Sequence, residues 1–329
     1  MFQSGVMKMI RVGFIGVGNI SRRHFNALGR MRDHAEIVAV CDVVEDRARS
    51  VARELGAVGY TSSHQMLATE RLDAIYVCLP PDAHVDQELT AAARGIHLFV
   101  EKPLPLDIEK AEAIARNVRR AGIVTAVGFH WRYLSHVRGL RDTLATECVG
   151  MATGSFMNLL PGTPWWRVAS RSGGQVVEQA VHVFDMARFL LGDAETVHAN
   201  YARRVMQDEP GFDQDDVHVV NLRFRSGAVA SFAVTSILHR RWRVGLDIFC
   251  RNRVYRVRDD ELEIDDRDGI RTVPNTVDAG FAETDAFIRA IVTGDRSGIL
   301  SDYDDALLTQ RVVLGSNLSA RTGQVVHLP

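Results

Sequence analysis

Residues 10–21 read IRVGFIGVGNIS, and this stretch decides the fold of the first half of the chain. Its first six residues are nearly all apolar, which predicts a strand buried on both faces of a parallel sheet. The strand runs directly into Gly16-Val17-Gly18-Asn19-Ile20-Ser21, a GxGxxG-type turn with serine in the third glycine position. The first glycine allows a tight turn, and the second lets a phosphate approach the backbone. The helix that follows offers its free N–H groups to that phosphate.

The second predicted strand, residues 37–41, ends at Asp42, the place where an acceptor for a ribose 2′-hydroxyl is expected. A carboxylate there repels a 2′-phosphate, so the sequence predicts NAD as the cofactor and disfavours NADP. Two alternatives stay open, because Asp42 could cap the helix beginning near Val44 and Arg47 could reach a 2′-phosphate. The residues of this part that we expect at the cofactor are Gly16, Gly18, Asn19, Ile20 and Asp42.

Short apolar runs alternate with amphipathic stretches through the first 130 residues. Strands are expected at residues 10–15, 37–41, 74–79, 97–100 and 124–127, and helices at 19–31, 44–55, 84–93 and 107–121. This alternation predicts right-handed crossovers and an open, twisted parallel sheet. The sequence therefore predicts an α/β Rossmann domain with a doubly wound sheet over residues 1–130.

The pattern changes beyond residue 130, where we expect a second, α+β domain over residues 131–329. Extended runs separated by turn signals predict an antiparallel meander. These runs lie at residues 151–160, 196–201, 217–224, 228–236, 244–249 and 254–257, and helices are expected at 135–144, 176–191, 282–293 and 302–318.

The composition is that of a globular chain, with 46% hydrophobic and 24% charged residues and a formal net charge of −2. This balance speaks against nucleic acid or an anionic membrane as a partner, and the basic stretches 239–243 and 251–253 fit solvated strand faces or an oligomer interface. The four cysteines show no metal spacing and fit free thiols in the cytoplasm. We expect no membrane span and no signal peptide, and we expect residues 1–6 to form a loose tail.

The predicted strand at 97–100 ends in Glu101-Lys102-Pro103. Ligands of open α/β sheets bind outside the carboxyl ends of the strands, so Lys102 is placed to reach into the cofactor crevice. A partly desolvated lysine there can bind a substrate oxygen and can have a lowered pKa. Taken alone, a lysine at a strand end is more often a surface charge.

Within the predicted helix 176–191, Glu178, His182 and Asp185 are spaced four and three residues apart and would share one helical face. The rest of this helix is very apolar, so these polar groups need partners or a ligand. Imidazole can take a proton from an alcohol near neutrality, which makes His182 a candidate base. A satisfied core histidine is the alternative. A metal site is disfavoured because no third histidine or cysteine ligand stands nearby, so we expect no metal.

Together these motifs resemble the glucose-fructose oxidoreductase / inositol dehydrogenase / rhizopine catabolism (Gfo/Idh/MocA) family over essentially the whole chain. The matching segments are GFIGVGNIS (13–21), CD (41–42), LPPDAH (79–84), EKP (101–103), GGQVVEQAVHVFD (173–185) and DYDDALLTQRVVLGSNLSARTGQVVHL (302–328). The resemblance implies a Rossmann domain followed by a domain built on a large open antiparallel sheet, through which homodimers or homotetramers form.

The resemblance also implies roles for individual residues. The family's catalytic lysine maps to Lys102 and its general acid/base histidine to His182. The acidic residue one turn before the histidine is commonly Asp and is Glu178 here, so its job is left open. The resemblance adds further residues on the cofactor side, namely Leu79, Pro80, His84, Glu101 and Lys102.

The implied function is hydride transfer between nicotinamide and a secondary hydroxyl of a sugar, inositol or related polyol. Expected substrate contacts are Arg132, Trp165, Trp166 and Arg167, because aromatic faces suit the C–H faces of a sugar ring and arginine suits hydroxyls or a carboxylate. Plain packing is the alternative for these residues. Two other functions stay open: an NAD-using glycoside hydrolase and a non-catalytic cofactor-binding sensor.

Overall fold

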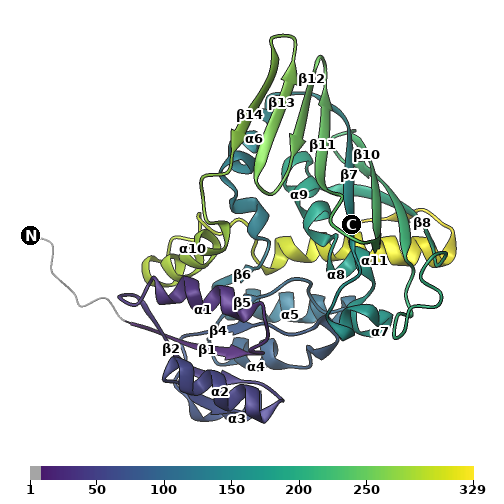
Figure 1. The fold of residues 1–329 in the computed structure, drawn as a ribbon. Coiled ribbons are helices and arrows are strands. Elements are labelled where there is room, and N and C mark those ends of the chain that lie inside the picture. The colour runs from purple at the N-terminus through teal and green to yellow at the C-terminus, as the bar shows by residue number, and fades with distance from the viewer. Residues whose placement is uncertain (1–8) are drawn as a thin grey trace, which may run out of the picture.

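The computed structural model describes residues 9–329, so the expected tail at residues 1–6 lies outside the described residues. Within this range the strands form one sheet of six and one of nine. Figure 1 shows the smaller sheet and its helices in purple and blue, with the larger sheet rising from them in teal and green. No described helix has both the length and the apolar character needed to cross a bilayer.

The first sheet has the strand order β3-β2-β1-β4-β5-β6, and each pair in it is parallel within the described chain. The Rossmann prediction is confirmed. Its strands are β1 Ile10–Ile15, β2 Ala35–Cys41, β3 Val58–Tyr60, β4 Ala74–Val77, β5 His97–Val100 and β6 Thr125–Val127. The helices between them are α1 Ser21–Gly29, α2 Glu45–Leu55, α3 Ser63–Thr69, α4 Gln87–Ala93 and α5 Ile108–Ala121. Strand β3 and helix α3 were not predicted from the sequence, because they are too short to show a period.

The second sheet has the strand order β14-β13-β12-β11-β7-β10-β9-β8-β15. Its strands are β7 Val149–Leu159, β8 Ala194–Ala202, β9 Val217–Phe224, β10 Val229–Leu238, β11 Arg243–Cys250, β12 Arg253–Val257, β13 Glu261–Asp266, β14 Gly269–Pro274 and β15 Val326–His327. All described pairs are antiparallel except β7 with β10. These two strands are joined through helices and the strands β8 and β9, and not by a hairpin, so they can run in the same direction.

The helix expected at residues 176–191 is broken. Helix α8 spans Gln175–Glu178 and helix α9 spans Val181–Leu191. Between them the N–H of Ala180 donates to the carbonyl of Gln175, five residues back, at 2.9 Å. Such π-type widening often occurs at functional sites, and it means that residues on either side of the break do not share one helical face.

The last two helices tie the halves of the chain together. Helix α10, Ala279–Thr293, packs against α1, and helix α11, Tyr303–Thr322, lies along α5, α9 and β8. Phe287 of α10 meets the rings of Tyr76 and Phe99 edge-on, with both centroid distances 5.7 Å. A helix from the second half of the chain therefore completes the core on one face of the first sheet.

The glycine turn after β1 yields a stability prediction. Gly16 has φ +86°, and a Cβ atom there would lie 2.3 Å from the carbonyl oxygen of Cys78. Gly18 has no such neighbour within 4 Å. We expect Gly16→Ala to lower the free energy of unfolding by about 1–3 kcal/mol, and Gly18→Ala to change it by about 0.5 kcal/mol or less. Urea unfolding of the two variants checks this, and equal midpoints would contradict it.

Candidate active site

Lys102 follows β5 at the carboxyl edge of the first sheet and reaches a residue of the second half. Its ammonium donates to the backbone carbonyl of Glu178 at 2.8 Å and to Oε1 of the same residue at 3.2 Å. The side chain of Lys102 is 13% exposed and that of Glu178 is 4% exposed. The strand end and helix α8 therefore meet through a largely buried ion pair, and Lys102 is not a free surface charge.

Only one carboxyl oxygen of Glu178 contacts Lys102. Burial raises its pKa above the usual value, against the opposing charge and hydrogen bond of Lys102. Its Oε2 atom is buried and has no hydrogen-bond partner among the described residues. This oxygen is available to a group that enters the site.

His182 lies in the first turn of α9 and is half-buried. Its ring stacks on Trp131, with a centroid distance of 5.2 Å, and meets His130 nearly edge-on at 5.0 Å. Burial lowers the pKa of His182 well below the usual value, and the nearby Lys102 and His130 add to this effect. The imidazole is therefore neutral near pH 7 and can accept a proton.

His130, which packs against His182, was not predicted from the sequence. It stands in the short helix η2, His130–Tyr133, close after β6. Burial lowers its pKa to about 3, with the charge of Arg23 as the next cause. The rule that pointed to Lys102, that ligands bind beyond the carboxyl ends of parallel strands, could have found it.

A buried network holds the segment that carries Lys102. Oε1 of Glu101 lies 2.8 Å from Nε2 of His24, and Oε2 of Glu101 accepts the backbone N–H of Lys102 at 3.1 Å. Burial opposes ionisation of Glu101, but the hydrogen bond and charge of His24, with Arg23 adding, bring its pKa down to about 2. Arg23 also pairs with Glu283 of α10 at 2.6 Å. Glu101, expected at the cofactor, thus has its carboxylate engaged in positioning Lys102.

The residues around the glycine turn leave room for a ligand. Asn19 and Ile20 are exposed at the start of α1, and Gly18 is half-exposed.

Asp42 accepts hydrogen bonds from the N–H groups of Val17 at 3.1 Å and Val44 at 2.9 Å. The first contact places the carboxylate beside the turn, and the second reaches only the N-cap residue of α2, Val44, so no side chain caps this helix. Both oxygens of Asp42 also lie within hydrogen-bond distance of Arg47. Leu79 and Pro80, which follow β4, are half-exposed.

His84 packs beside Glu88, and its expected place at the cofactor stays a prediction. Its side chain is fully buried, and its Nδ1 is hydrogen-bonded to Glu88 one turn later. Its backbone carbonyl accepts a hydrogen bond from Lys110 at 2.8 Å. Its other ring nitrogen, Nε2, is buried and has no hydrogen-bond partner among the described residues, so Glu88 satisfies only one side of the ring.

Arg132 is buried in ion pairs and is not available to a substrate, which corrects the expectation for it. Its guanidinium makes two hydrogen bonds to Asp185, at 2.8 and 2.6 Å, and an ion pair with Asp305 at 2.6 Å. Its side chain is 3% exposed. Asp185 is therefore the buried partner of Arg132.

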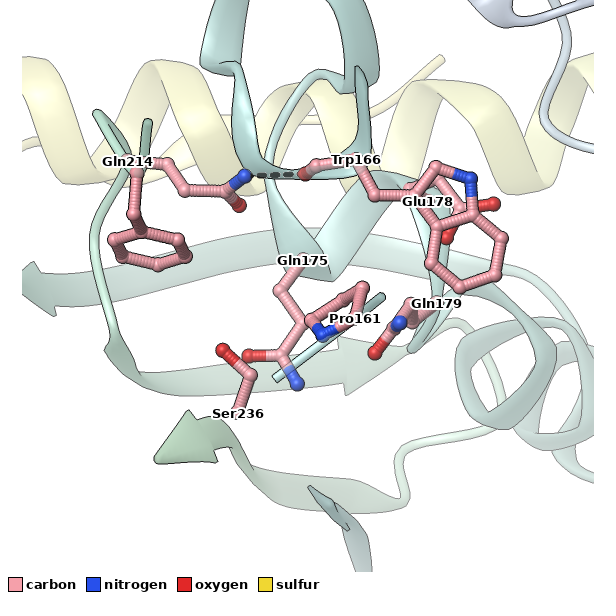
Figure 2. Close-up of a pocket in the computed structure, with 8 residues that line it drawn as sticks. Pro161, Trp166, Gln175, Glu178, Gln179, Gln214 and Ser236 are labelled. Carbon is pink, nitrogen blue, oxygen red and sulfur yellow. Dashed lines mark hydrogen bonds between the residues drawn. The ribbon is translucent and has the colours of Figure 1, made fainter. Parts of the chain in front are cut away.

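The loop ahead of α8 does reach the site. Helix η3, Pro164–Arg167, carries Trp165 and Trp166, whose rings meet edge-on at 5.7 Å. Figure 2 shows Trp166 next to Glu178 at a small cavity. Arg167 is instead engaged by Glu209 at 2.9 Å and by the carbonyl of Pro161 at 2.9 Å.

Comparison with known proteins identifies the two halves of the chain. Residues 10–129 match the family described as an oxidoreductase family with an NAD-binding Rossmann fold, and residues 149–256 match the GFO/IDH/MocA C-terminal domain. The chain is 30% identical to the myo-inositol 2-dehydrogenase of Thermotoga maritima over 67% of its own length. The alignment spans 66% of that relative, just under two thirds of its length.

Solved structures share the whole fold. A levoglucosan dehydrogenase in complex with NADH and L-sorbose superposes with a TM-score of 0.88 at 22% identity, covering 98% of this chain and 100% of that one. The WlbA dehydrogenase of Bordetella pertussis, in complex with NADH and UDP-GlcNAcA, gives a TM-score of 0.85 at 23% identity, covering 98% and 99%. At such identities the likeness shows the fold alone.

The low pKa of His130 predicts an acid-sensitive fold. An unfolded histidine titrates near 6.5, whereas His130 in the folded chain titrates near 3. Between these values the unfolded chain binds more protons, so the free energy of unfolding decreases as pH falls from 6.5. Between pH 7 and pH 5, we expect the wild type to lose about 2 kcal/mol more than a His130→Phe variant does.

Urea titrations of both proteins at the two pH values provide the measurement. The other titrating groups are common to both proteins, so the difference reports His130 together with its effect on the pKa of His182. The same pH dependence in the two proteins would refute the assignment.

Proposed function

Because this chain belongs to the GFO/IDH/MocA family of NAD-binding oxidoreductases, we propose that it transfers a hydride between NAD and a secondary hydroxyl of a sugar, inositol or related polyol. The observation that carries the proposal is the meeting of Lys102 with Glu178 and His182 at the carboxyl edge of the parallel sheet. Nicotinamide dinucleotides bind at this edge in Rossmann folds.

The residues present fit such a cofactor. The open space at Gly18 and the exposed start of α1 suit a pyrophosphate, which a helix N-terminus attracts. Asp42 stands at the end of β2, where a carboxylate can accept a hydrogen bond from a ribose hydroxyl. When bound, the nicotinamide ring supplies the hydride acceptor.

The side chains of His182, Lys102 and Glu178 then have different roles toward the substrate. Neutral His182 takes the hydroxyl proton, since its lowered pKa keeps it unprotonated at pH 7. The ammonium of Lys102 donates a hydrogen bond to the same oxygen and stabilises the negative charge that develops there. Glu178 holds Lys102 in place through Oε1 and keeps Oε2 for a neighbouring hydroxyl.

The proton-handling pair leads to the central prediction. We expect the wild type to reduce NAD in the presence of a free neutral polyol, followed by the absorbance of NADH. Lys102→Met and His182→Phe should each lower kcat/KM by about 10²–10⁴-fold, because each removes a group that acts on the proton or the charge in the transition state. The exposed His64, substituted in the same way to phenylalanine, is the matched control and should retain full activity.

Full activity in Lys102→Met or His182→Phe would contradict the role assigned to that residue. NAD binding without net NADH formation from any polyol would shift the proposal to another function. Glycoside cleavage would then indicate a redox-neutral NAD-using hydrolase, and the absence of any turnover would indicate a sensor.

Cofactor choice provides a separate prediction at Asp42. The wild type should bind NADH at least about tenfold more tightly than NADPH, because Asp42 repels a 2′-phosphate. Asp42→Ala releases Arg47 from its ion pair and should reduce or reverse this preference. Fluorescence titration with both nucleotides measures the ratio. Adding Arg47→Ala should remove the gain for NADPH, and an unchanged ratio in Asp42→Ala would rule out the proposed role.

A further inference from the structure

Three consecutive residues after β6 surround the imidazole ring of His182. Phe129 meets this ring edge-on, with a centroid distance of 6.3 Å and an interplanar angle of 90°. His130 also meets it nearly edge-on, at 5.0 Å and 80°. Trp131 instead stacks on it, at 5.2 Å and 27°. Of these three rings, only the indole of Trp131 covers a face of the imidazole.

The fold fixes the position of Trp131 against His182. Trp131 lies in η2 and is 8% exposed, so packing holds its side chain. The next residue, Arg132, makes two hydrogen bonds to Asp185, at 2.8 and 2.6 Å. Asp185 lies in α9, three residues after His182. The buried ion pair therefore joins the short helix that carries the indole to the helix that carries the imidazole.

His182 lacks the hydrogen bond that usually orients a catalytic histidine. Its Nδ1 atom is buried and has no hydrogen-bond partner among the described residues. In many enzymes a carboxylate or a backbone carbonyl on this nitrogen fixes the ring and stabilises the imidazolium. The orientation of this ring therefore depends on the side chains packed against it, and the stack on Trp131 is the contact that sets its plane.

The groups around His182 make its protonated form costly. Burial is the largest cause that lowers its pKa. Three neighbouring basic groups add to this shift, in the order Lys102, His130 and Arg23. The carboxyl group of Glu178 would favour an imidazolium, but it is already engaged by Lys102 at 3.2 Å. A contact that stabilises the cation therefore makes proton transfer to His182 easier.

The indole of Trp131 provides such a contact. Aromatic rings carry negative charge density over their faces, and they attract a cation that lies within about 6 Å of the ring centroid. Tryptophan is the strongest of the aromatic side chains in this respect, and the attraction is larger where water is excluded. Trp131 is buried and lies within this distance of His182, so it offsets part of the cost of the imidazolium.

We propose that Trp131 is a positioning residue for His182, which holds the plane of the imidazole ring and stabilises the imidazolium that forms when His182 takes the hydroxyl proton. The inference rests on the proposed function, because it concerns the step in which that proton moves. The substrate O–H bond breaks and an N–H bond forms on His182, while the hydride leaves the carbon that carries this hydroxyl for the nicotinamide. Trp131 acts through His182 and needs no contact with the substrate.

The first measurement tests the stack without turnover. In NMR spectra of the ligand-free protein, the ring protons of His182 should be shifted upfield by the indole, and the signal lost in His182→Phe assigns them. Trp131→Leu should remove this shift, and Trp131→Phe should retain part of it. The exposed Trp242, changed to leucine, is the matched control and should leave the shift in place.

The second measurement tests the charge effect through the pH profile of kcat/KM for polyol oxidation. The acid limb of this profile reports the pKa of the base in the free enzyme. Trp131→Leu should move the limb to lower pH by about one unit and lower the plateau by up to about tenfold, because the imidazolium loses its contact with the indole. Trp131→Phe should lie between the leucine variant and the wild type.

A graded version of this measurement keeps the packing intact. Fluorine substituents draw electron density from the indole face while hardly changing its size. Protein made with singly and doubly fluorinated tryptophan should therefore show an acid limb that moves stepwise to lower pH. The chain has four tryptophans, so Trp131→Phe protein made with the same amino acids keeps the other three and is the control. Its limb should not move on fluorination.

The two measurements fail in different ways. An upfield shift that persists in Trp131→Leu would overturn the stack. An acid limb that stays in place in the leucine variant and in the fluorinated proteins would overturn the charge role even where turnover is slower, because lost packing alone lowers the rate without moving the limb. A protein that shows the stack but reduces no NAD with any polyol would refute the proposed dehydrogenase activity, and with it the proton transfer, but not the placement of His182 by Trp131.

Discussion

The ion pair between Lys102 and Glu178 is the interaction on which the site depends. It joins the carboxyl end of a strand in the parallel sheet to a four-residue helix in the second half of the chain. Neither group is easily buried alone, because a charge without a partner in a low-dielectric interior carries a large desolvation cost. The pair therefore makes the two halves interdependent: the sheet supplies the cation, and the broken helix supplies both the carboxylate and, one turn later, His182.

A second group of buried charged side chains holds the backbone of Lys102 in place. Glu101 binds the backbone of Lys102 and the ring of His24, while Arg23 lies between Glu101 and Glu283 of α10. Burial raises the pKa of Glu283 to about 8 against the opposing charge of Arg23, and the Glu101 carboxylate adds to the shift. One arginine thus faces two buried carboxylates of which one is ionised, an arrangement in which the two groups titrate as a pair. Helix α10 therefore contributes Phe287 to the core of the first sheet and Glu283 to the charged network at the end of β5.

The sequence by itself determined the Rossmann half, because its signals are local. A run of apolar residues followed by Gly16 and Gly18 specifies a strand and a tight turn, and alternating strand and helix patterns specify parallel pairing. Lys102 was predictable because it directly follows such a strand. His182 stood out as a polar residue in an apolar helix. Even so, the roles of Lys102 and His182 in a reaction stay a prediction that experiments must decide.

Only the tertiary structure decided which polar groups are free and which are already paired. Arg132 resembles a substrate contact in sequence but is buried against Asp185, 53 residues away, and one ring nitrogen of His84 is hydrogen-bonded to Glu88 inside the fold. The break in the helix at Gln179 could not be predicted either, because its apolar pattern continues across the interruption. Partners distant in the chain fix such outcomes. Desolvation and pairing depend on what surrounds a side chain in space, and a local pattern carries no information about that.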